Sequence, residues 1–516
     1  MARKLCVLVA VLAFMAGTAS AQDAKTVLTA ASKAMGALKS VQITGTGWNA
    51  AVGQSFGPEE DWPRFEVTRY TRTIDYDARS SQEEFTRRQG NNPPRGGGGT
   101  PIQGEQQQVF IVSGTYAWNM QDGKPVPQPG LFLAGIPVAE LRQLDILLTP
   151  HGFLRAAQAG NPTAISLTLP ASPGAITQNG KATLVSFTAM GKYKVVGTFN
   201  DQNLLEMVHT WIPNPVYGDM LYELRYTNYK DFGGVKFPTV LHIHHGDPRL
   251  SVAHNSMEIT LSSVQPNVSV PAIAVPDAVQ KATAPPVRAE SQKLADGIWF
   301  VGGGTHNSLA VEFRDFVTVI EAPLNEQRSL AVIGEVSRLI PNKPIRYVVN
   351  THHHFDHSGG LRTYLAQGAT IVTHQRNREY YEQVLFNPAP RTLQPDRLST
   401  FYPYFSPGRR PLPFETVNQK FVLSDGVRNI DLYPVQGLNH HANMLIVYFP
   451  KEKILVNADL YTPPPQGAQA PAPNASMRSL NQNIQRLKLD VAQHVPLHGQ
   501  PGPNDQFMQI VGKQSN

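Results

Sequence analysis

The fold of this chain is decided by the stretch Thr351-His352-His353-His354-Phe355-Asp356-His357-Ser358-Gly359-Gly360. An apolar run, residues 345–349, precedes it and predicts a buried strand. The run 361–367 follows the two glycines and predicts a short helix, so the polar residues lie on a strand-to-helix turn. In an extended backbone alternate side chains share one side. His352 and His354 can therefore reach one cation together, and Asp356 and His357 can face a second position nearby.

The residue types in this turn suit a metal. Imidazole nitrogen and carboxylate oxygen both bind zinc, and imidazole also binds iron. The alternative is a polar, histidine-rich loop without a metal. Four titratable groups packed within six residues favour the metal, because buried groups of this kind need a partner.

Length and composition set the outer limits. At 516 residues the chain is too long for one ordinary core, which predicts two domains. The formal net charge is +6, and no run of Lys and Arg is longer than about a pair. That charge is too weak and dispersed to indicate a nucleic-acid partner.

The first residues are typical of a secretory signal peptide. Met1 to Lys4 is the charged start, residues 5–16 are apolar, and Ala19-Ser20-Ala21 is a small-residue cleavage site. Cleavage after Ala21 would place the mature protein in a periplasm or outside the cell. The apolar run is too short for a membrane anchor, and we expect no stable membrane span. The single cysteine, Cys6, would be lost, leaving no disulfide framework and no thiolate ligand.

Residues 22–270 read as a β-rich domain. A helix is expected at 24–40 and a second, broken near Pro150, at 137–157. Alternating patterns predict strands at 43–47, 64–76, 108–118, 164–169, 182–189, 193–200, 204–212, 222–229, 235–245 and 256–264. This mostly antiparallel arrangement loosely resembles the half-barrel of periplasmic lipoprotein carriers, which implies room for a lipid or another hydrophobic ligand. The alternative is a structural cap on the second domain.

Two other features belong to this part of the chain. His242, His244 and Asp247 imitate the later motif, but no distant ligand set accompanies them, and we expect histidines on a sheet face without a metal. Residues 271–289 are rich in Pro and Ala and predict a linker, with the second domain at 290–516. In that domain, strands at 298–301, 308–313, 316–320 and 369–373 alternate with helices at 325–340 and 376–384, which predicts a layered α/β domain.

The motif Thr-His-x-His-x-Asp-His resembles the metallo-β-lactamase fold superfamily over about residues 290–505. This resemblance implies a four-layered αββα fold and three further ligands in order. His440 or His441 precedes an apolar strand, and the resemblance favours His440, four residues before Met444. Asp459 ends the return strand, and His498 comes before a glycine near the C-terminus.

Carried over position by position, the resemblance implies two divalent cations, with zinc expected first and iron or manganese left open. One cation would be held by His352, His354 and His440. The other would be held by Asp356, His357 and His498, with Asp459 between the two. A carboxylate at 459 resembles the glyoxalase II and lactonase branches, whereas the best-known zinc β-lactamases have Cys or Ser there.

The implied mechanism uses a hydroxide held between the two cations as the nucleophile, with Asp356 as both ligand and orienting group. Three nearby residues also enter the prediction. His306 and Tyr461 are candidates for contact with substrate, and Glu321 stands where this fold supports the metal loop from outside. His353, His441 and His494 are expected to be neighbours of the site and not ligands.

The sequence therefore predicts a secreted, binuclear metal-dependent hydrolase acting on a small-molecule ester, lactone, thioester or amide, a β-lactam included. The alternative is a periplasmic scaffold protein that holds a hydrophobic ligand in its N-terminal domain and has an inactive metal domain. The intact ligand set favours the enzyme.

Overall fold

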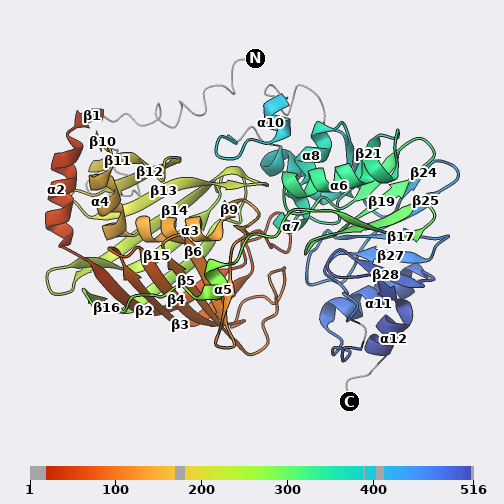
Figure 1. Ribbon diagram of the computed structural model, residues 1–516, viewed down its shortest axis with the longest axis horizontal. Coiled ribbons are helices and arrows are strands. Elements are labelled where there is room, and N and C mark those ends of the chain that lie inside the picture. The colour runs from red at the N-terminus through yellow and green to blue at the C-terminus, as the bar shows by residue number, and fades with distance from the viewer. Residues whose placement is uncertain (1–18, 169–180, 387–389, 402–411, 466, 513–516) are drawn as a thin grey trace.

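The computed structural model describes residues 19–168, 181–386, 390–401, 412–465 and 467–512. Figure 1 shows two parts side by side, a large N-terminal sheet and a C-terminal layered part. The predicted signal peptide lies almost wholly outside the described residues, and Ala19–Gln22 forms the short strand β1.

The N-terminal part is built on one antiparallel sheet, in the order β1-β10-β11-β12-β13-β14-β15-β16-β2-β3-β4-β5-β6-β7 within the described residues. Its strands are β1, β2 (Ser40–Ala50), β3 (Arg64–Asp75), β4 (Ser80–Arg88), β5 (Glu105–Ser113), β6 (Tyr116–Gln121), β7 (Lys124–Pro127), β10 (Thr163–Thr168), β11 (Lys181–Ala189), β12 (Tyr193–Phe199), β13 (Leu205–Asn214), β14 (Gly218–Asp231), β15 (Lys236–His245) and β16 (Asn255–Pro266). The strands β8 (Leu131–Phe132) and β9 (Ile136–Pro137) form a separate small pair. The predicted mostly antiparallel β-rich region is confirmed.

Three helices pack on this sheet: α2 (Ala24–Met35), α3 (Val138–Leu147) and α4 (Pro150–Ala159). The break near Pro150 is confirmed, because Thr149 caps α4 and its hydroxyl accepts from the Gly152 N–H. Helix α4 lies close to the strands. A side chain at Gly197 on β12 would meet the Phe153 ring at 2.4 Å, so only glycine permits this approach.

His151 on α4 gives this region a dependence on pH. Its side chain is buried, its ring stacks on Phe237 with centroids 5.9 Å apart, and its Nε2 lies 3.3 Å from the Met35 carbonyl. Burial lowers the pKa of His151 from its ordinary value of 6.5 to about 4. The unfolded chain therefore takes up this proton more readily. The neutral His151 side chain therefore makes its full contribution to the unfolding free energy above pH 6.5, and this contribution is lost as pH falls towards 4.

The unfolding free energy of the wild type should fall between pH 7 and pH 5. In the variant His151→Gln we expect this fall to be smaller by about 2 kcal/mol, at about 1.4 kcal/mol per pKa unit. Urea unfolding at the two pH values measures this difference. An unchanged pH dependence in the variant would contradict the assignment.

The C-terminal part contains two sheets. The first has the order β17-β18-β19-β20-β21-β22-β23 and the second β24-β25-β26-β27-β28-β29. Their strands are β17 (Glu290–Ala295), β18 (Ile298–Gly302), β19 (Ser308–Glu312), β20 (Val317–Ile320), β21 (Ile345–Val349), β22 (Thr370–His374), β23 (Phe414–Val417), β24 (Phe421–Ser424), β25 (Asn429–Pro434), β26 (Leu445–Phe449), β27 (Ile454–Asn457), β28 (Gln493–Pro496) and β29 (Gly502–Pro503).

Helices flank these sheets. They are α6 (Glu326–Leu339), α7 (Phe355–Ser358), α8 (Leu361–Ala366), α9 (Gln375–Tyr380) with the π-helical turn η1 (Tyr381–Leu385), α10 (Arg397–Phe401), α11 (Ala475–Leu487) and α12 (Asn504–Val511). Strand β19 shows the layering, because Leu309 and Val311 pack toward the second sheet while Ala310 packs in the cluster that contains α6. The predicted four-layered αββα fold is confirmed.

The two parts share packing. One hydrophobic cluster contains residues of both, and the Phe355 ring on α7 lies edge-on to Tyr217 of the N-terminal part, with centroids 5.0 Å apart. The Arg391 guanidinium donates to the carbonyls of Pro215 and Val216. Between the parts, the predicted linker contains the short helix α5 (Asp277–Gln280). The predicted domain boundaries at 270 and 290 stay a prediction.

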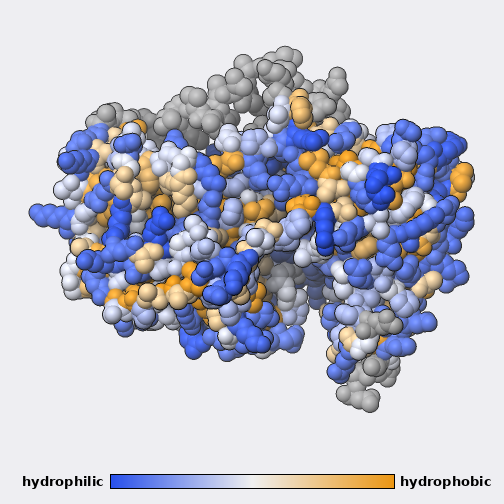
Figure 2. Space-filling view, in the orientation of Figure 1, coloured by the Kyte–Doolittle hydropathy of each residue, from blue (hydrophilic) through white to orange (hydrophobic). Residues whose placement is uncertain are grey.

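The surface is mainly polar on the face drawn in Figure 2, with apolar residues scattered among hydrophilic ones. In the described part of the chain we find no helix that combines the length and the apolar character required to cross a bilayer.

Candidate metal centre

The histidine-rich turn directly follows strand β21 and faces the second sheet. The strand ends at Val349, the turn carries His352 and His354, and α7 carries Asp356 and His357. The two glycines that follow permit a close crossing, since a side chain at Gly359 would meet the Leu324 carbonyl oxygen at 1.9 Å. One at Gly360 would meet the Ser329 hydroxyl at 2.1 Å. The turn is thus held against the start of α6.

A buried carboxylate fixes the base of this turn. Glu321, fully buried after β20, accepts from Asn350 Nδ2 at 2.9 Å and from the Thr351 hydroxyl. Its Oε2 also lies 3.1 Å from His357 Nδ1. This contact leaves His357 Nε2 free to face the site, which agrees with the supporting role expected for Glu321.

The second sheet supplies the remaining candidate ligands. His440 lies in the loop before β26, Asp459 follows β27, and His498 follows β28. Strands β27 and β28 are parallel, with Asn457 opposite Pro496. Asp459 and His498 each come two residues after these paired positions. The parallel register therefore brings them to the same end of the sheet.

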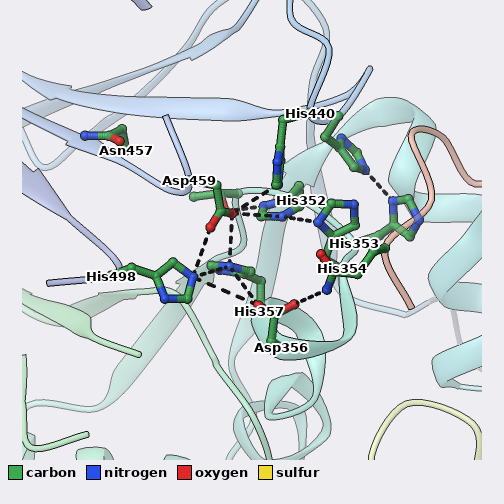
Figure 3. Close-up of polar contacts among 12 residues, drawn as sticks. His352, His353, His354, Asp356, His357, His440, Asn457, Asp459 and His498 are labelled. Carbon is green, nitrogen blue, oxygen red and sulfur yellow. Dashed lines mark hydrogen bonds and ion pairs between the residues drawn. The ribbon is translucent and has the colours of Figure 1, made fainter. Parts of the chain in front are cut away.

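The side chains form two donor groups that meet at Asp459 (Figure 3). The first group is His352, His354 and His440, in which His352 Nε2 lies 2.9 Å from His354 Nδ1. The second is His306, Asp356, His357 and His498, in which His498 Nε2 lies 3.0 Å from His357 Nε2. Asp459 Oδ2 lies 3.3 Å from His440 Nε2 and 3.1 Å from His357 Nε2. The structure thus brings all seven predicted ligands together.

The donor set fits divalent cations. His440 Nε2 and Asp459 Oδ2 are buried, face the middle of the cluster and lie 3.3 Å apart, without a hydrogen bond of good geometry. Buried polar atoms without a hydrogen-bonding partner are costly, and a cation would satisfy both. His441 is placed differently, because its Nε2 faces His353 Nδ1 and its Nδ1 accepts from the Asn443 N–H. This geometry favours His440 over His441 as the ligand.

The protonation states also suit metal binding. Burial and the neighbouring His440 lower the pKa of His354 to about 3, and burial lowers the pKa of His352 as well. Both are therefore neutral imidazoles that can donate an electron pair. Burial alone would raise the pKa of Asp459, but His357 and His440 outweigh it, so the carboxyl is ionised.

His357 is the exception in this set. Burial alone would lower the pKa of its imidazole, but the Asp459 and Asp356 carboxylates outweigh that effect and raise it. A cation bound at this position would take the place of that proton.

His306 takes a larger part than the sequence indicated. Its Nε2 lies 3.1 Å from Asp356 Oδ2, and its ring centroid lies 4.1 Å from that of His498. Arg328 fixes the loop, since its guanidinium donates to the His306 and Gly302 carbonyls. The sequence around His306, a single histidine after three glycines, has no pattern that predicts a metal ligand.

Tyr461 lies apart from the donor groups. Its side chain is buried, with its ring against His494 and Phe507 at centroid distances of 5.1 and 4.8 Å. Contact between Tyr461 and substrate stays a prediction. His494 is bonded to Asn504, 3.0 Å away, and is likewise outside the donor groups.

The N-terminal histidines that imitate the motif make local contacts. His242 on β15 lies 2.9 Å from Glu258, and His244 lies 3.0 Å from Glu223. Among the described residues, the groups close enough to hold a metal do not include these histidines.

Part of this chain matches a known protein family. Residues 301–494 match the family described as the metallo-beta-lactamase superfamily. A search of curated proteins found no match.

Several solved structures are similar to part of this chain. A metallo-beta-lactamase from Pontibacter korlensis is 16% identical, with a TM-score of 0.32 over 44% of this chain and 100% of its own. FIM-1 from Pseudomonas aeruginosa, in its mono-zinc form, is 19% identical, with a TM-score of 0.32 over 45% of this chain and 97% of its own. The rubredoxin oxygen:oxidoreductase of Desulfovibrio gigas is 18% identical, with a TM-score of 0.32 over 43% of this chain and 60% of its own. The family match therefore places the similarity to the metallo-beta-lactamase superfamily in residues 301–494, within the C-terminal part.

Proposed function

We propose that this chain is a secreted or periplasmic hydrolase that depends on two divalent cations and cleaves a small-molecule ester, lactone, thioester or amide. The observation that carries the proposal is the pair of donor groups meeting at Asp459, whose Oδ2 and the facing Nε2 of His440 are buried without a hydrogen bond of good geometry. Zinc is the first choice of cation, because imidazole and carboxylate donors suit it.

Each donor group would hold one cation: His352, His354 and His440 the first, and Asp356, His357 and His498 the second, with Asp459 shared. These residues would hold cations that supply Lewis acidity, which would lower the pKa of a water molecule towards neutrality and polarise the oxygen of the scissile group. A serine or cysteine nucleophile is then unnecessary.

The exposure of the donors favours one direction of approach for the substrate. The side chains of His352 and His354 are fully buried, whereas those of Asp356 and His498 are 31% and 27% exposed. A substrate would therefore reach the centre on the side of Asp356 and His498.

Asp356 is also suited to handle a proton. Its Oδ2 faces the second donor group and is placed to accept a proton from the attacking water. His306 Nε2, 3.1 Å from Oδ2, is placed to pass that proton on.

The test is elemental analysis of the purified full-length protein beside the variant His352→Ala. We expect about two divalent metal ions per chain in the wild type, as in other two-metal hydrolases, and fewer in the variant. The matched control is His242→Ala, which removes a histidine–carboxylate contact outside the centre and should keep the metal.

A hydrolase screen of esters, lactones, thioesters and β-lactams on the metal-loaded wild type follows. Folded protein that neither contains nor takes up zinc, iron or manganese would overturn the proposal. N-terminal sequencing of exported protein tests the predicted cleavage after Ala21.

A further inference from the structure

A loop of the N-terminal part reaches into the metal centre. It is the segment Gly53–Phe56, in the connection between β2 and β3. Almost 300 residues separate it along the chain from the histidine-rich turn that it contacts. The contacts are specific and involve both donor groups.

Gln54 holds the Asp356 carboxylate. Its Nε2 donates to Asp356 Oδ1 at 2.8 Å, and its Oε1 accepts from the Gly98 N–H at 3.1 Å. The Gly98 donor fixes which end of the amide carries the oxygen, so the NH2 end must face Asp356. The Gln54 carbonyl also accepts from the Gly97 N–H at 2.9 Å. Side chain and backbone of Gln54 are therefore both tied down.

Ser55 holds two histidines of the turn. Its carbonyl lies 2.9 Å from His354 Nε2, so that nitrogen carries the proton and Nδ1 is left for the centre. Its hydroxyl lies 2.9 Å from His353 Nε2. The N-terminal part thereby sets the tautomer of a ligand in the first donor group and anchors its neighbour.

The same segment and a glycine-rich loop, residues 96–99, hold the backbone on either side of His440. The Ala442 N–H donates to the Phe56 carbonyl at 2.8 Å, and the Gly96 N–H donates to the Asn439 carbonyl at 2.7 Å. Both bonds flank His440 in the chain.

Glycine is required where this packing is closest. A side chain at Gly97 would meet Gln54 Oε1 at 2.0 Å and His354 Cε1 at 2.9 Å. Gly53 has a φ of +79°, and a side chain there would meet the Phe355 ring at 2.4 Å. The glycine-rich loop, residues 96–99, therefore packs behind the metal centre.

We infer that the segment Gly53–Phe56 is a structural part of the metal centre and that Gln54 is the positioning residue for Asp356. By occupying Oδ1, Gln54 turns Oδ2 toward His306, His357 and His498. The inference rests on the proposed function in taking Asp356 as a ligand. It assigns to the N-terminal part a role in the chemistry beyond that of a cap or a carrier.

Two variants of the full chain test the inference. Gln54→Met removes both side-chain hydrogen bonds at nearly constant volume. Gln54→Glu keeps an acceptor for the Gly98 N–H but presents an acceptor to Asp356 Oδ1. If Gln54 only held the glycine-rich loop, Gln54→Glu would behave as the wild type. If Gln54 positions Asp356, both variants lose function.

We expect both variants to bind the more weakly held metal ion about 10- to 100-fold less tightly, which is the usual effect of losing a partner that orients a ligand. Competition with a chelator measures this loss, and the visible spectrum of the cobalt-substituted protein should change shape. The value of kcat should fall by a similar factor, with a smaller change in KM. Gln89→Met is the matched control, because Gln89 bonds backbone groups of the same loop without touching the centre.

The outcomes separate the two proposals. Wild-type protein without metal overturns the proposed function. Wild-type protein with two metal ions, and Gln54→Glu matching it in metal affinity, spectrum and kcat, overturns the role of Gln54 and leaves the proposed function intact.

Discussion

The variant Asp356→Ala should lose at least 100-fold in kcat and release the metal ion of the second donor group. In the wild type, Asp356 Oδ2 lies 3.1 Å from His306 Nε2 and 3.5 Å from His357 Nε2, and Asp356 supplies the carboxylate within the second donor group. Loss of a well-placed proton acceptor alone lowers rates about 10²- to 10⁴-fold, and loss of a ligand adds to this. Asp356 therefore combines two functions that one substitution removes.

The measurement is kcat with the best substrate of the screen, together with metal content. Circular dichroism should remain that of the wild type, because the N-terminal sheet does not depend on this carboxylate. Glu258→Gln is the control, since it removes a carboxylate that faces His242 in the same manner but far from the centre. Full activity in Asp356→Ala would show that the site is wrongly assigned.

The second large effect is expected for Glu321→Gln, on stability as well as on metal binding. The carboxylate is fully buried and accepts from Asn350, Thr351 and His357. An amide of the same shape places an NH2 group against at least one of these donors. A buried unsatisfied donor costs about 1–3 kcal/mol, and more where a charged partner is involved. We therefore expect a loss of about 3 kcal/mol in unfolding free energy.

Metal affinity should fall in the same variant, about 10- to 100-fold, because His357 loses the contact that fixes its ring. Chemical denaturation of the metal-free protein and chelator competition separate the two effects. Glu312→Gln is the matched control: Glu312 pairs with Lys343 at the surface, and such pairs contribute up to about 1 kcal/mol. Equal effects of the two substitutions would contradict the role given to Glu321.

Much of the candidate centre could be predicted from sequence because its donors lie next to strands. An apolar strand ending at Val349 fixes the place of His352 and His354, and parallel strands bring the residues after them to one end of a sheet. The backbone at Asp459 turns with a φ of +58°, so strand alternation no longer predicts where the next side chains point. Tyr461, whose buried ring packs against His494 and Phe507, lies just beyond this turn.

Gln54 and Ser55 could not be predicted. They lie in an irregular loop without hydrophobic periodicity, and no pattern links them to a turn some 300 residues later. Their role depends on how the two parts of the chain pack, through contacts such as Phe355 against Tyr217. The glycine-rich loop shows the same limit. Composition indicates a loop, whereas only the packing shows that a side chain at Gly97 would collide with Gln54 and His354.

The order of these residues along the chain has a consequence for biosynthesis. The residues that form the centre run from Gln54 to His498, so a nascent chain has no complete donor set until His498 has been added. At about 5–20 residues per second, roughly 20 to 90 s separate the synthesis of the first from that of the last. Metal can fill the complete centre only after His498 has been added, long after the chain has supplied Gln54 and Ser55.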